Sequence, residues 1–95
     1  MQLEISQEAK SDIFILQHIG YATFGINHTR VYVDGLMGVL KLIGASPGLA
    51  RIREEFGRGV RIHPYKGHLV FYRIDQNAVK VLRILSKYQN WIDRL

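Results

Sequence analysis

The sequence predicts an α+β domain with the element order β-α-α-β-β-β, in which a helical hairpin packs on a small antiparallel sheet. Apolar residues recur at helical spacing in the first half, whereas alternating apolar runs separated by short turns fill the second half. Helices followed by consecutive strands are typical of the α+β class. A length of 95 residues leaves room for one core, so we expect residues 1–95 to form a single domain.

The first half is expected to form a short strand and two antiparallel helices. Residues 2–6 alternate apolar and polar side chains, as a strand does. Ser6 is then a good N-cap for an amphipathic helix that ends near Gly25. A second helix is predicted over residues 27–43.

Two glycines interrupt the predicted second helix. Gly35 and Gly38 each cost about 1 kcal/mol relative to alanine in a helix interior. We interpret them as positions that let the first helix approach closely.

The second half reads as a charged connector followed by three strands and a tail. The connector covers residues 49–59, and the strands are predicted over 60–64, 68–75 and 78–85. The tail, residues 86–95, is too short and polar for a helix to be predicted.

The last two strands should form a hairpin whose turn is Gln76-Asn77, and both of its faces are apolar. Pairing back from this turn places four residues on the face expected to meet the helices: Leu69, Phe71, Leu82 and Ile84. The opposite face carries Val70, Tyr72, Val81 and Leu85 around Arg83. Such a face needs a cover, which could be part of the same chain or another protein.

Composition limits the classes of function. Hydrophobic residues make up 47% and charged residues 22%, which is typical of a globular domain and excludes a disordered chain. The N-terminus does not resemble a signal peptide and no apolar run could span a bilayer, so we expect a cytoplasmic location without membrane contact. The chain lacks cysteine and its four histidines lack ligand spacing, so neither a metal nor a cofactor is expected.

The charge is concentrated in the second half of the chain. The net charge is +5, and ten of the thirteen Lys and Arg residues lie between positions 51 and 94. A basic half suits an acidic partner, although +5 also serves solubility alone.

One group of residues could support RNA cleavage through the 2′-hydroxyl. That reaction needs a cation at the phosphate and groups that move protons, for which the candidates are Arg61, Arg83, Lys87 and Tyr88. The alternative is that Arg83 binds an acidic partner residue and that Lys87 and Tyr88 only end the strand.

These features together resemble the RelE/ParE superfamily of bacterial type II toxins, and in particular its ParE-like branch. The resemblance lies in Ala9–x2–Asp12-Ile13, Gly25, Tyr32 and Ser46-Pro47-Gly48, and then in the segments GVR (59–61), HLVFYRI (68–74) and VKVLRIL (79–85). ParE-like chains commonly carry a histidine and an aspartate where this chain has Ser86 and Asn90.

The resemblance implies a toxin that causes growth arrest by inhibiting DNA gyrase without catalysis of its own. It also implies direct neutralisation by a cognate ParD-like antitoxin in a hetero-oligomer, with DNA contacted only through the antitoxin. The alternative implied by the RelE branch is a ribosome-dependent mRNA endoribonuclease. A chain that only binds an antitoxin is a third possibility.

We predict two sets of contact residues on this basis. The antitoxin is expected to contact Phe14, Ile15, Val70, Tyr72, Arg73, Val81, Arg83 and Leu85. The target is expected to contact Arg61, Lys87, Tyr88 and Trp91.

Overall fold

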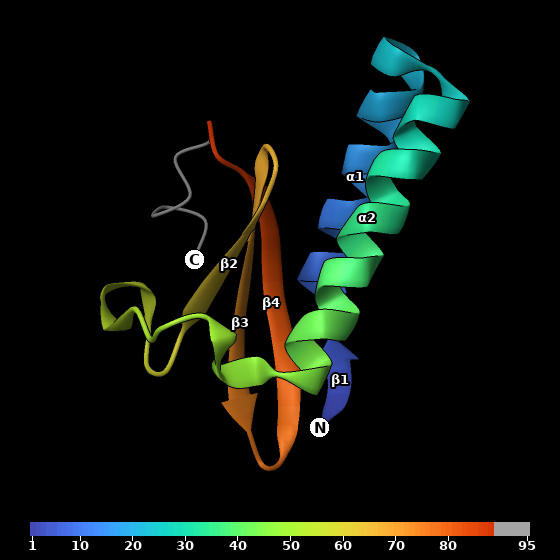
Figure 1. The fold of residues 1–95 in the computed structure, drawn as a ribbon. Helices are drawn as coiled ribbons and strands as arrows, with labels where there is room; N and C mark the ends of the chain where they lie inside the picture. Colours follow the sequence, from blue (N-terminus) through green and yellow to red (C-terminus); the bar gives the residue numbers. More distant parts are fainter. Residues whose placement is uncertain (89–95) are drawn as a thin grey trace.

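A computed structural model describes residues 1–88 and contains the predicted order of elements (Figure 1). The helices are α1 (Gln7–Phe24) and α2 (Ile26–Ala45), followed by the short 3₁₀ turns η1 (Pro47–Leu49) and η2 (Glu54–Phe56). The strands are β1 (Gln2–Ile5), β2 (Arg61–Tyr65), β3 (His68–Asp75) and β4 (Ala78–Ser86). The α+β class and the helical hairpin are therefore confirmed.

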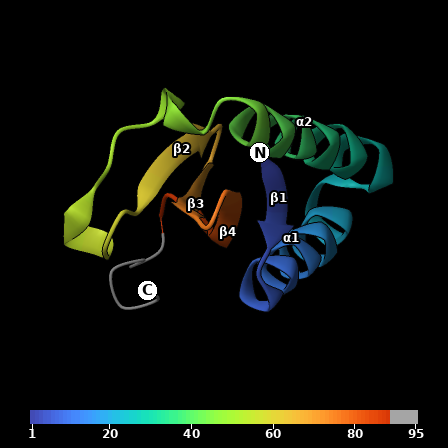
Figure 2. The same ribbon diagram turned by 90° about the horizontal axis from the view of Figure 1, so that it is seen from below.

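The sheet has four strands in the order β1-β4-β3-β2, and it is mixed rather than wholly antiparallel. β1 runs parallel to β4, whereas β2 with β3 and β3 with β4 are antiparallel. The two helices lie on one side of the sheet and the connector lies on the other side (Figure 2). β1 therefore lies at the edge of the sheet beside β4.

The start of α1 is tied directly to β4. The Ser6 hydroxyl accepts a hydrogen bond from the Ala9 N–H at 3.0 Å, so the predicted N-cap is confirmed. The same hydroxyl donates to the Leu82 carbonyl at 2.8 Å. α1 ends at Gly25, whose φ of 87° is a conformation that glycine adopts without strain.

Close approach of the two helices depends on Gly20 and not on the glycines of α2. A Cβ at Gly20 would lie 2.6 Å from the Thr29 Oγ1. A Cβ at Gly35 would meet the hydroxyl of Tyr65 from β2 instead, at 2.1 Å, and a Cβ at Gly38 would have nothing within 4 Å. The sequence-based interpretation of Gly35 and Gly38 is therefore wrong.

The β3–β4 hairpin turns at the predicted residues but changes register along its length. Gln76 and Asn77 have φ values of 51° and 63°, as the tight hairpin turns require. Tyr72 pairs with Val81 as expected, but an irregularity between Phe71 and Tyr72 makes Phe71 pair with Arg83. The regular pairing predicted beyond Tyr72 is wrong because one extra residue of β4 shifts the alternation of faces.

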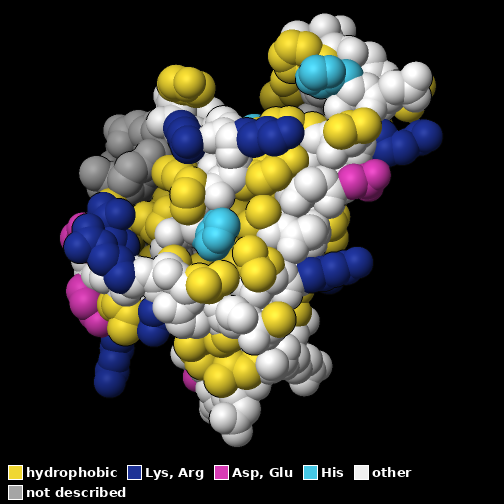
Figure 3. Space-filling view, viewed as in Figure 1, with side chains coloured by type: hydrophobic (Ala, Val, Ile, Leu, Met, Phe, Trp, Pro, Cys, Tyr) yellow, Lys and Arg dark blue, Asp and Glu magenta, His cyan; other side chains and the backbone are white. Residues whose placement is uncertain are grey.

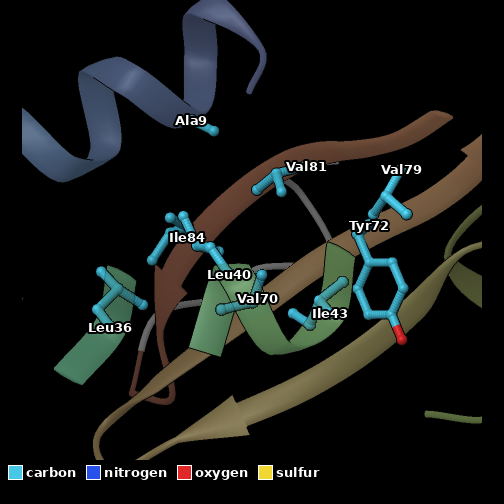
Figure 4. Close-up of a cluster of buried hydrophobic side chains, with 9 residues drawn as sticks. All are labelled: Ala9, Leu36, Leu40, Ile43, Val70, Tyr72, Val79, Val81 and Ile84. Atoms are coloured by element: carbon cyan, nitrogen blue, oxygen red, sulfur yellow. The ribbon is translucent and has the colours of Figure 1, made fainter. Parts of the chain in front are cut away.

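The main core lies between the helices and the sheet face that was expected to need another cover. Val70, Tyr72 and Val81 point toward α2 and are fully buried (Figure 4). They pack with Leu36, Leu40, Ile43 and Ala9, and with Val79 and Ile84. Of the residues predicted to meet the helices, only Ile84 belongs to this cluster; the assignment of Leu69, Phe71 and Leu82 is wrong.

The opposite face of the sheet is covered by the connector of the same chain. Phe71, Leu85 and Val60 form a second buried cluster, against which Leu69, Leu82, Ile62 and Phe56 pack. The Phe56 ring of η2 meets the Phe71 ring edge to face, with 6.3 Å between centroids. The helices therefore cover one apolar face of the hairpin, and the connector covers the other.

Candidate partner-binding site

Arg83 is paired within the protein. Its Nε and Nη2 donate to the two carboxylate oxygens of Asp12 on α1, each at 2.8 Å. The Arg83 side chain is 20% exposed and that of Asp12 is 9% exposed. Hydrogen bonding to Asp12 raises the pKa of Arg83, and Asp12 also accepts the Ile84 N–H at 2.9 Å. This geometry holds α1 against β4.

Asp12 was not predicted as a functional or structural partner. The signal in the sequence was Arg83 itself, because a guanidinium inside an apolar strand requires a carboxylate or another acceptor. Nothing in the spacing of the two residues identifies Asp12 as that acceptor, since they are 71 positions apart.

Arg61 and Arg83 do not converge on one site. Arg61 lies on β2 and donates to the Ala50 carbonyl of the connector. β3 lies between β2 and β4 in the sheet and so separates the two strands (Figure 2). The two guanidinium groups are therefore held apart by separate structural contacts.

The other predicted basic and aromatic residues lie near the end of β4 or on β3. Lys87 and Tyr88 are exposed in the turn after β4, and the Tyr88 side chain is 92% exposed. Arg73 is partly buried on β3 and pairs across the hairpin with Lys80. Trp91 lies outside the described residues.

The predicted antitoxin-contact residues divide into two groups. Val70, Tyr72, Val81 and Leu85 are at most 2% exposed and have no surface to offer a partner. Phe14 and Ile15 are 61% and 55% exposed on α1. The sequence pattern could not distinguish these groups, because it did not show which sheet face the helices cover.

The exposed apolar surface continues along the helical hairpin. Ile19 and Phe24 of α1 are also largely exposed, and both line a depression between the hairpin and the ends of β3 and β4. This depression, the hairpin pocket, has a volume of about 460 Å³. Leu16, Ile19 and Phe24 form its apolar wall, and Thr29, Tyr32, His68 and Ser86 contribute polar groups. Sequence analysis did not predict it.

A network of aromatic and histidine side chains holds the polar end of the pocket. The Tyr32 hydroxyl and the His68 Nδ1 lie 2.7 Å apart, and the Tyr65 hydroxyl donates to the Tyr32 carbonyl at 2.7 Å. Burial lowers the pKa of His68 and raises the pKa of Tyr32. Both groups are therefore neutral near pH 7.

The surface is basic beside the connector and apolar between the hairpin and the sheet. Lys and Arg side chains gather on the connector side of the molecule, and hydrophobic side chains continue across the middle of this face (Figure 3). Across residues 1–88, no three His, Asp or Glu side chains form a metal-binding group. Neither described helix has the length and apolar character needed to cross a membrane.

Comparisons with known proteins place this arrangement among bacterial toxins. Residues 3–91 match the family described as the ParE toxin of the type II toxin-antitoxin system, parDE. The curated toxin ParE1 of Caulobacter vibrioides is 26% identical over 86 residues, which are 90% of this chain and 88% of the relative. The solved structure described as a chromosomal ParDE toxin-antitoxin system from P. aeruginosa has a TM-score of 0.81 at 17% identity. That match covers 90% of this chain and 95% of the other chain, and it shows a shared fold.

Proposed function

This chain belongs to the ParE toxin family of type II toxin-antitoxin systems, and we propose that it inhibits DNA gyrase and is neutralised by a cognate ParD-like antitoxin. The observation that carries the proposal is the family match, which extends over residues 3–91 and thus over every described helix and strand except the first residue of β1. The proposed place of action is the cytoplasm, where gyrase and its DNA are found.

The exposed side of α1 is the proposed antitoxin-binding surface. Phe14, Ile15 and Ile19 are each more than half exposed, which is unusual for large apolar side chains gathered on one helix. An amphipathic segment of the antitoxin could bury them as it folds on the toxin. The net charge of +5 favours an acidic segment, which would associate faster through long-range attraction.

Four of the residues expected to contact the antitoxin lie in the core and do not belong to this surface. Val70, Tyr72, Val81 and Leu85 are buried by the helices and the connector, so an antitoxin could reach them only by unfolding the domain. Arg83 is already engaged with Asp12 and serves mainly to hold α1. Arg73 and the exposed pair Lys87 and Tyr88 remain candidates for contact with the antitoxin or with gyrase.

The ribonuclease alternative has less support. Its candidate cations at the phosphate include Arg61 and Arg83, but each guanidinium is bound to a different part of the fold. Releasing Arg83 would leave the Asp12 carboxylate without its cation in a mostly buried position. A gyrase inhibitor needs no such convergence of catalytic groups.

Two assays test the proposed target in parallel. Purified toxin is added to a supercoiling reaction with DNA gyrase and to ribosomes translating a defined mRNA. We expect loss of supercoiling and intact mRNA, and induced expression should give filamentous cells with an SOS response. Cleavage of ribosome-bound mRNA with unaffected supercoiling would establish the alternative.

The antitoxin surface is tested by charge substitution on α1. Ile15→Glu and Ile19→Glu should each weaken binding of the ParD-like protein encoded beside the toxin gene by at least about tenfold, because a buried carboxylate would lack a partner. Val31→Glu is the matched control, since Val31 is 69% exposed on α2 and does not line the pocket. Equal losses of binding affinity for all three variants would mean that the exposed side of α1 is not the antitoxin-binding surface.

A further inference from the structure

Basic side chains are concentrated along one edge of the sheet. β2 is an edge strand, preceded by the connector and followed by the turn into β3. Residues 49–67 contain five Lys and Arg residues but only two acidic residues, Glu54 and Glu55. Both carboxylates are already engaged, since Glu55 pairs with Arg53 at 3.1 Å and Glu54 accepts the Gly59 N–H at 3.3 Å. The cations of this edge therefore exceed the carboxylates that could neutralise them.

Two exposed arginines lie at the start of β2. Arg51 and Arg58 belong to the connector, on the side of the molecule where Lys and Arg side chains gather (Figure 3). The bridge between Ile52 and Arg61 holds this part of the connector against the first residue of β2. Within residues 1–88, neither Arg51 nor Arg58 forms an ion pair with a carboxylate.

Two exposed lysines lie at the other end of β2. Lys66 is in the turn into β3, where its ammonium lies 5.6 and 5.5 Å from the ring centroids of Tyr32 and Tyr65. The Lys87 N–H donates to the Gly67 carbonyl at 2.9 Å, so Lys87 lies beside the same turn. Among the described residues, neither lysine pairs with a carboxylate. At about 3.3 Å per residue, β2 separates the two basic ends by about 13 Å.

The outer edge of β2 is poorly suited to pairing with another strand. Its first residue, Arg61, already bridges to Ile52 of the connector. Pro64 has no N–H to donate, and its carbonyl oxygen lies 2.9 Å from the His63 Nδ1, which must be the donor. Such features prevent strand addition at sheet edges. A partner at this edge would therefore be held mainly by side chains.

A row of side-chain cations along such an edge fits a polyanion with a regular backbone. We propose that the β2 basic strip, made of Arg51, Arg58, Lys66 and Lys87, binds the sugar–phosphate backbone of a nucleic-acid duplex. A duplex carries one phosphate per about 3.4 Å of axis on each strand, so about four phosphates match the length of β2. Contacts of this kind position a duplex without reading its bases, so no sequence preference is expected.

This binding goes beyond the proposed function, because it requires neither gyrase nor an antitoxin. It also departs from the expectation that DNA is contacted only through the antitoxin. Binding is measured on the chain alone, so its failure is distinguishable from a failure of the supercoiling or antitoxin assays.

The salt dependence of binding tests the proposal. The purified chain is titrated into a short fluorescent DNA duplex at several salt concentrations, and anisotropy is followed. The logarithm of the binding constant should fall with that of the salt concentration with a slope of about −3 to −4, because each phosphate contact releases counter-ions. Arg58→Gln and Lys66→Gln should each reduce this slope by about 0.9 and weaken binding about threefold at low salt.

The matched controls remove the same charge elsewhere. Arg30 and Lys10 are exposed on α2 and α1, away from β2, so Arg30→Gln and Lys10→Gln should leave the slope unchanged. If Arg58→Gln or Lys66→Gln fails to fold, Arg51→Gln or Lys87→Gln replaces it at the same end of β2.

An RNA duplex and an acidic peptide are titrated in parallel with the DNA duplex. Tighter binding of one duplex identifies which nucleic acid supplies the backbone. The proposal would be overturned by equal slopes for the strip variants and the controls, by an acidic peptide that binds as tightly as the duplexes, or by the absence of salt-dependent binding to either duplex.

Discussion

Arg83 and Asp12 form two parallel hydrogen bonds of 2.8 Å between strand β4 and helix α1. The Asp12 carboxylate also accepts the Ile84 N–H, so one side chain serves both the guanidinium and the strand backbone. Six residues earlier, Ser6 caps the helix and donates to the Leu82 carbonyl. Helix α1 is thereby attached to β4 at two adjacent points by polar contacts as well as by packing.

Replacing Asp12 with asparagine should lower the free energy of unfolding by about 2 kcal/mol, because the Arg83 charge would lose its partner in a mostly buried position. Urea denaturation measures this loss. The control is Asp75→Asn, which removes the more exposed pair with Lys80 and should cost less than about 0.5 kcal/mol. Equal losses for both variants would show that the Asp12 pair has no special role.

Two glycines of α2 should respond to alanine in opposite directions. Gly35→Ala should lower the free energy of unfolding by about 1–2 kcal/mol, because the new methyl group displaces Tyr65 and breaks its bond to the Tyr32 carbonyl. Gly38→Ala should raise it by up to about 1 kcal/mol, since the space is open and alanine favours the helix. Thermal unfolding of both variants tests the pair, and a gain for Gly35→Ala would contradict the close approach of Tyr65.

The stability of the domain should depend on the protonation of His68. Burial lowers its pKa in the folded state below the ordinary value of 6.5, so the unfolded chain binds more protons. The contribution of neutral His68 is therefore complete above pH 6.5 and decreases as the pH falls from there through the folded-state pKa.

His68→Asn isolates this dependence, because asparagine keeps an acceptor for Tyr32 but does not titrate. Chemical denaturation at pH 7.5 and pH 5 should show a smaller loss of stability on acidification for the variant than for the wild type. Identical losses would mean that protonation of His68 does not oppose folding.

The connector should stabilise the domain through Phe56. Phe56→Ala removes the ring that covers Phe71 and should lower the free energy of unfolding by about 2 kcal/mol, less than for a fully buried phenylalanine. Leu49→Ala is a control in the same connector, since Leu49 is 58% exposed and should change stability by less than about 0.5 kcal/mol. If both substitutions had the same effect, the connector would not act as a cover.

Features that depend on neighbouring residues could be predicted from the sequence. Ser6 caps α1 because its hydroxyl reaches an amide only three residues away, and Gln76-Asn77 forms the turn because both residues tolerate positive φ. The order of helices and strands follows from the same kind of local signal. Phe14 and Ile15 were expected to contact the antitoxin, and both are exposed on α1.

Features that depend on distant residues could not be predicted in this way. The extra residue of β4 near Leu82 pairs Ile84 with Val70 and Leu85 with Leu69, so both residues lie on other faces than expected. Val70, Tyr72 and Val81 share one face as predicted, but the sequence did not show that the helices cover this face, so these residues were expected at a partner interface although they form the core.

The sequence by itself determined the fold class, the family resemblance and the boundaries of the main elements, because periodicity, capping and turn chemistry act over a few residues. Only the tertiary structure decided that β1 lies parallel to β4, that Arg83 pairs with Asp12, and that the connector covers the second face of the sheet. Each of these is a contact between segments far apart in the chain. Such contacts are selected by the packing and hydrogen bonding of the whole domain.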